Sequence, residues 1–250
     1  MNRMSHFAER LGRIALAGAI AGGLAGLVWG GIGGRIAMRI IFLTSDARFV
    51  GLESDDGFTI GQFSASTMFL VMATTMIGGF LGPVAALLRT AMRNRTVIAA
   101  TGFAVAFGAF VGGAIVRADG IDFRLLGPLV LTVGLFVLIP AGAAFTAVFL
   151  LDHLLRPGGR ISRLPSGLAI VICAFAPFPF IVSTGAAIRT PLGLLILMAA
   201  VGGGIGIAAL GTDDSAGRRR RAAHWVVWVL IGAVTVVGVA ELARDIAALT

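Results

Sequence analysis

The sequence predicts an all-α bundle of about seven transmembrane spans, forming a single integral membrane domain over residues 1–250. Of the 250 residues, 58% are hydrophobic and only 13% are charged, whereas soluble domains carry about 25% charged residues. The mean hydropathy is +0.98, and several apolar runs reach the ~20 residues that cross a bilayer. The chain also contains 36 glycines, and glycine in apolar helices favours close helix packing.

Seven apolar runs follow one another along the chain, with short polar connections between them. Only residues 189–191 separate the fifth run from the sixth. There Pro191 cannot continue a helix and Thr190 can begin a new one, so we interpret this break as a hairpin turn, with a re-entrant break as the alternative. Asp122 is the expected N-cap of the fourth run. The runs cover approximately 14–43, 63–88, 97–116, 125–151, 168–188, 192–210 and 222–242.

The arginines predict the orientation, because cytoplasmic loops of membrane proteins are enriched in basic residues. With the N-terminus in the cytoplasm and the C-terminus outside, thirteen loop arginines lie inside and five lie outside. Arg35 and Arg39, at the end of the first run, are counted on neither side. The inner set is Arg3, Arg10, Arg13, Arg89, Arg93, Arg95, Arg156, Arg160, Arg163, Arg218, Arg219, Arg220 and Arg221, and the outer set is Arg48, Arg117, Arg124, Arg189 and Arg244.

All 20 basic residues are arginine, and the sequence contains neither lysine nor tyrosine. This usage is typical of GC-rich genomes, so we expect a bacterial source and a multi-pass protein of the inner (plasma) membrane. The +8 formal charge would suggest nucleic acid in a soluble protein. Here the arginines flank apolar runs, so topology explains them and no nucleic-acid partner is expected.

The first run contains five glycines at intervals of four residues. On a helix this spacing produces a smooth ridge without side chains, in the manner of a glycine zipper, and another helix can approach it closely. We therefore expect this run to be the central packing element of the bundle. The five residues are Gly18, Gly22, Gly26, Gly30 and Gly34.

Arg35 and Arg39 follow the glycine row and lie on one helix face, since they are four residues apart. An arginine at membrane depth costs ~2.5–3.5 kcal/mol on insertion scales, so both need partners. One interpretation is an ion-pair cluster with acidic residues of the outer loops. The other is an anion site for a lipid phosphate or a carboxylate solute, both of which suit the guanidinium fork. The acidic candidates are Asp55, Asp56, Asp119 and Asp122.

No motif in the sequence assigns a reaction, and we predict no catalytic, cofactor or metal site. Our first hypothesis is a non-enzymatic bundle that acts by packing with lipids, with copies of itself or with a partner subunit. Arg218–Arg221 would contact anionic head groups, at ~1 kcal/mol per basic residue. The second hypothesis is a small transporter or channel for an anionic or lipid-like solute that uses Arg35 and Arg39. The third is an enzyme that acts on lipid head groups at the outer face and uses Asp119 or Asp122 together with Arg35 and Arg39.

Overall fold

The computed structural model describes residues 3–46, 65–92, 95–118, 123, 125, 127–156 and 216–250. In these ranges all regular structure is helical, which confirms the predicted class for this part of the chain. The helices are α1 (Arg3–Ala25), the π-helix η1 (Gly26–Gly33), α2 (Gly34–Thr44), α3 (Ala65–Ala91), α4 (Thr96–Ile115), α6 (Leu129–Leu154) and α10 (Ala216–Leu249).

Five helical segments of the described part are long and apolar enough to cross a membrane. They correspond to the first four expected spans and to the last one, with the first extending from Glu9 to Thr44 through α1, η1 and α2. The expected spans 168–188 and 192–210 lie outside the described residues, as does the break at 189–191. The count of seven therefore stays a prediction.

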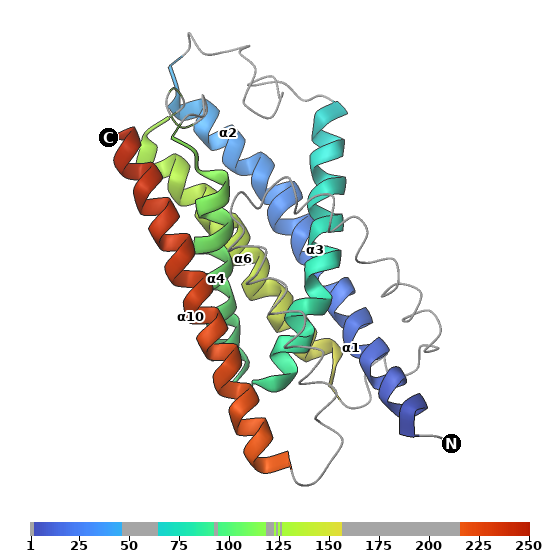
Figure 1. Ribbon diagram of the computed structural model, residues 1–250. Coiled ribbons are helices and arrows are strands. Elements are labelled where there is room, and N and C mark those ends of the chain that lie inside the picture. The colour runs from blue at the N-terminus through green and yellow to red at the C-terminus, as the bar shows by residue number, and fades with distance from the viewer. Residues whose placement is uncertain are drawn as a thin grey trace.

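The five spans of the described part run in alternating directions, so the two ends of the chain lie at opposite ends of the bundle (Figure 1). We call the end at which α1 begins the N-terminal end, and the other the C-terminal end. α3 and α6 both finish at the N-terminal end, and α4 and α10 both begin there (Figure 1). The ends of these helices bring Arg89, Arg95, Arg156 and Arg221 to one side of the bundle, as the arginine pattern requires.

The fourth span begins later than the sequence predicted. α6 starts at Leu129 and its N-cap residue is Pro128, not Asp122. The preceding Gly127 has φ of +59°, the only positive φ among the described residues. A glycine in this conformation followed by proline interrupts a helix, because a positive φ lies outside the right-handed helical region and proline lacks the N–H donor. The apolar residues 125 and 126 extended the predicted span across this break, although Gly127–Pro128 is a turn signal in the sequence.

The described helices pack as neighbouring pairs: α1 lies along α3, α4 along α6, and α10 along α4. Small side chains dominate the buried positions, with Ala17, Ala21 and Ala86 between α1 and α3, and Ala99 and Ala100 on α4. Larger residues such as Leu151 and Val227 fill the remaining interior. The high alanine and glycine content thus allows short distances between helix axes, where dispersion contacts hold helices together without a hydrophobic driving force.

The closest helix approach is between α1 and α3. A Cβ atom added to Gly18 would meet the carbonyl oxygen of Gly82, and one added to Gly22 would meet that of Gly78. The relation is reciprocal, since Cβ atoms added to Gly78 or Gly82 would meet the carbonyl oxygens of Gly22 and Gly18. All four distances fall below 3.0 Å, where real Cβ atoms essentially never lie.

The first span changes its winding in the middle of the bundle. Residues Gly26–Gly33 form a π-helix, in which the backbone N–H of Gly34 is shared between the carbonyl oxygens of Trp29 and Gly31. In a regular α-helix, glycines four residues apart drift about 40° around the axis at each step, because a turn has 3.6 residues. A π-helix winds more residues into each turn and offsets this drift. Gly26 and Gly30 consequently both still face Thr74 of α3.

Candidate functional site

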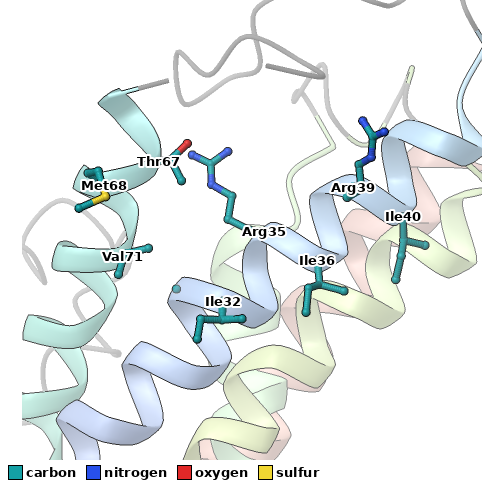
Figure 2. Close-up of a pocket in the computed structure, with 9 residues that line it drawn as sticks. Ile32, Arg35, Ile36, Arg39, Ile40, Thr67, Met68 and Val71 are labelled. Carbon is teal, nitrogen blue, oxygen red and sulfur yellow. The ribbon is translucent and has the colours of Figure 1, made fainter. Parts of the chain in front are cut away.

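An open groove lies at the C-terminal end of the bundle, between the first span and α3. Its volume is about 450 Å³, which is large enough for a segment of an amphiphile. The floor and sides are apolar, and the polar side chains are two arginines and one threonine (Figure 2). The lining residues are Gly31, Ile32, Arg35, Ile36, Arg39, Ile40, Thr67, Met68 and Val71.

The groove begins where the close glycine contact between the first span and α3 ends. Gly31 faces Val71, with an added Cβ 3.3 Å from that side chain, so the helices are still close there. One α-helical turn later, Arg35 lies on the same side of the first span and points toward Thr67, one turn earlier on α3 (Figure 2). The change from glycine to arginine forces the two helices apart, and the space between them becomes the groove.

Three isoleucines form the apolar wall on α2 and η1. Ile32, Ile36 and Ile40 follow each other at four-residue intervals and project from the same side of the helix (Figure 2). They are 53%, 57% and 36% exposed, and Met68 on the opposite wall is 68% exposed. Large apolar side chains with this exposure face lipid in a membrane-spanning helix. The groove is therefore open sideways, along an exposed apolar face of the first span.

The two arginines differ in their surroundings. Arg35 is half-buried between α2 and α3, near Thr67, which is only 2% exposed. Arg39 lies one turn closer to the helix end and is exposed. Its guanidinium carbon is 5.0 Å from the centre of the Phe42 ring, a cation–π contact worth about 0.5–1 kcal/mol at an exposed site. Arg35 is thus oriented by the protein, while Arg39 leaves most of its donors accessible.

The acidic residues expected to pair with these arginines, Asp55, Asp56, Asp119 and Asp122, lie outside the described residues. The ion-pair interpretation therefore stays a prediction. Within the described ranges no group of three or more His, Cys, Asp or Glu side chains is placed to hold a metal ion. What the structure does bring together is two guanidinium groups and an apolar surface, an arrangement suited to an anion that carries a hydrocarbon chain.

The glycine row of the first span lies on α3 over most of its length. Gly18, Gly22, Gly26 and Gly30 each have α3 atoms closer than 3.0 Å to an added Cβ, and Gly34 has Leu70 at 4.0 Å. The row therefore loosens at the residue that precedes Arg35. The groove therefore lies where the tight contact between the first span and α3 ends. That contact holds the two walls of the groove together on the side of the N-terminal end.

Sequence reasoning missed a tryptophan in the middle of the first span. Trp29, within η1, points toward α6, where its indole Nε1–H donates a 2.9 Å hydrogen bond to the hydroxyl of Thr146. Its ring covers Gly142, one turn earlier on α6, so closely that an added Cβ there would lie 2.5 Å from a ring carbon. The spacing of Gly142 and Thr146 is a sequence signal, but nothing in the sequence links it to Trp29.

A polar cluster at the N-terminal end of the bundle was also missed. Arg89 at the end of α3 donates to Asp152 near the end of α6, with 2.7 Å between Nη2 and Oδ2. Thr96 at the start of α4 donates to the same oxygen at 2.6 Å. A second guanidinium nitrogen of Arg89 donates to the Met92 carbonyl at 3.1 Å. One carboxylate thus joins three helix ends.

Arg218–Arg221 lie in the first two turns of α10, at the same end of the bundle as this cluster.

No family model matches the chain, and neither a curated protein nor a solved structure shows significant similarity to it. The functional argument therefore depends on geometry. The groove combines two arginines on one helix face, a lateral opening and a polar residue on the facing helix.

Proposed function

We propose that this chain is a non-enzymatic, multi-pass protein of the bacterial inner membrane that holds an anionic phospholipid in the groove between α2 and α3. The observation that carries this proposal is the presence of Arg35 and Arg39 in the lining of an open, otherwise apolar groove near the end of the first span. A phosphate would bind the guanidinium groups, and an acyl chain would lie along Ile32, Ile36 and Ile40.

The membrane position of the groove supports a lipid rather than a water-soluble anion. The arginines lie in the last three turns of the first span, where the head-group region is expected, and Ile36 and Ile32 continue from there toward the middle of the span. Because the groove opens sideways, a lipid can enter it without leaving the bilayer. A basic residue near an anionic leaflet contributes ~1 kcal/mol, and dispersion contacts between the acyl chain and the isoleucines add to this.

We expect Arg35→Gln and Arg39→Gln each to reduce the retention of anionic phospholipid by about tenfold. Each substitution removes a charge-assisted hydrogen bond worth about 1.5–3 kcal/mol. Native mass spectrometry of protein exchanged between phosphatidylglycerol and phosphatidylcholine nanodiscs measures the preference directly. Arg244→Gln is the matched control, because Arg244 is an exposed arginine on α10 at the same end of the bundle and does not line the groove.

The structural alternative, an ion-pair cluster with Asp55, Asp56, Asp119 or Asp122, makes a different prediction. Arg39→Gln would then lower the thermal stability, and a matching Asp→Asn substitution would add little further loss. An unchanged lipid preference in both arginine variants would contradict the lipid site, whatever happens to stability.

Transport of a lipid-like anion is the second proposed function, because the groove extends along the helix from Arg39 to Gly31. Arg35 offers a second site one turn deeper than Arg39, so an anionic head group could pass from one to the other. A dithionite assay with fluorescent anionic lipid in proteoliposomes distinguishes the two functions. Faster movement of the lipid between leaflets than in protein-free vesicles supports transport. An unchanged rate supports binding without transport.

The proposed orientation can be tested on a single helix. Ala222 and Ala248 are both exposed and lie near opposite ends of α10. In a Cys173→Ala background, we expect an impermeant maleimide added to whole cells to label Ala248→Cys and not Ala222→Cys, because the arginine bias places the C-terminus outside. Permeabilised cells provide the control, in which both positions react. Labelling of Ala222→Cys in intact cells would reverse the orientation.

A further inference from the structure

The π-helix η1 connects two contacts on opposite sides of the first span. On one side Gly30 and Gly31 face Thr74 and Val71 of α3. On the other, Trp29 covers Gly142 and donates its hydrogen bond to Thr146 of α6. Adjacent residues of one helix are thereby held against two different neighbours, and the winding of η1 has to satisfy both.

A π-helix is rare and persists where the surrounding structure holds it. Trp29 is the one residue of η1 whose side chain can form a hydrogen bond, because the others are glycines and aliphatic residues. Its bond to Thr146 joins the first span to α6. Inside a bilayer an indole N–H has no water as an alternative partner, so loss of the Thr146 hydroxyl leaves the donor unsatisfied.

The winding of η1 determines where the groove arginines lie. If the segment relaxed into an α-helix, one residue would be left over and α2 would rotate by about 100° relative to α1. Arg35 would then leave the side of the helix that faces Thr67, and the isoleucine wall would turn with it. The π-helix is therefore a condition for the groove, although Trp29 and Thr146 do not line it.

We infer that the Trp29–Thr146 hydrogen bond is a latch that keeps η1 in its π-helical form, and that Trp29 and Thr146 are positioning residues for the groove between α2 and α3. The consequence for lipid binding depends on the proposed function, whereas the consequence for the position of α2 does not. Rupture of the bond is expected to rotate α2 against α3 and to weaken lipid binding from a distance.

The test measures the helix position without a ligand. Spin labels on Ile40→Cys of α2 and Phe69→Cys of α3, both exposed, report the α2–α3 distance by double electron–electron resonance in a Cys173→Ala background. We expect Thr146→Val and Trp29→Phe, which each remove one partner of the bond and keep most of the packing, to shift or broaden the distance distribution. Thr146→Ser keeps the acceptor and should match the parent protein.

Thr235→Val is the matched control for the loss of a threonine hydroxyl, because Thr235 bonds only to the Ile231 carbonyl of its own helix at 2.8 Å. In the same proteins without spin labels, the preference for phosphatidylglycerol is expected to fall threefold to tenfold in Thr146→Val and Trp29→Phe, the factor that one hydrogen bond contributes. Thermal unfolding is recorded for every variant.

Each outcome separates the latch from the lipid site. An unchanged α2–α3 distance in Thr146→Val and Trp29→Phe overturns the latch, even if thermal stability falls, and leaves the proposed function standing. A shifted distance supports the latch. If the distance shifts but the parent protein shows no preference for anionic lipid, the latch stands and the proposed function fails.

Discussion

Gly22→Ala is expected to destabilise the protein by about 1–3 kcal/mol, the usual cost of overpacking an interior that cannot adjust. The added methyl group would meet the carbonyl oxygen of Gly78 and the Cα atom of Gly82. Both are backbone atoms of α3, so no change of side-chain rotamer can relieve the contact. Thermal unfolding of the purified protein in detergent, followed by loss of the monodisperse peak in size-exclusion chromatography, measures the effect.

Gly23→Ala is the matched control for this prediction. Gly23 is the next residue of the same helix, and an added Cβ would lie 3.7 Å from the Thr75 carbonyl oxygen, an ordinary van der Waals distance. Its alanine variant should be neutral or slightly stabilising, because alanine is the better helix former. Equal stability of the two variants would show that α1 and α3 are not in close contact at Gly22.

Asp152→Leu is expected to cost about 2–3 kcal/mol, because it leaves the Arg89 guanidinium without its carboxylate in a half-buried site. The side chain of Arg89 is 12% exposed and that of Asp152 is 22% exposed, so the effect should fall below the value for a fully buried pair. Thr96 loses its acceptor in the same variant. Thermal unfolding again provides the measurement.

The double variant Arg89→Leu/Asp152→Leu should recover most of this loss, since replacing both charges by apolar groups leaves neither one unpaired. Glu9→Gln gives the comparison for an exposed pair. Glu9 and Arg13 lie 3.4 Å apart with side chains 35% and 42% exposed, and surface pairs contribute about 0–1 kcal/mol. A loss in Asp152→Leu no larger than in Glu9→Gln would contradict the structural role of the cluster.

Both sets of contacts lie on the N-terminal side of the groove. The glycine contact fixes α1 on α3, and the Asp152 cluster ties α3, α4 and α6 together at the N-terminal end of the bundle. The groove end of the first span, from Gly34 onward, has no comparably close contact with α3. We therefore expect the first span to adjust at η1 and α2 rather than along α1, consistent with the proposed latch.

The membrane character of this protein follows from its sequence by itself. Long apolar runs must form helices in a bilayer because each backbone N–H and C=O needs an internal partner. The same reasoning placed the second and third spans to within three residues, whereas the fourth started late because of the backbone at Gly127 and Pro128, and α10 extends beyond both predicted ends. The four-residue spacings also identified the glycines and arginines that share a face, because helical periodicity is a local property.

Only the tertiary structure decided which surfaces those faces meet. Trp29 and Thr146 are 117 residues apart, and Arg89 and Asp152 are 63 residues apart, so their hydrogen bonds depend on how separate helices pack. The π-helix has the same origin, since this rare winding persists where the surrounding structure holds it, and η1 contacts both α3 and α6. The groove at Arg35 and Arg39 depends on this winding, because it leaves Arg35 on the side of the first span that faces Thr67.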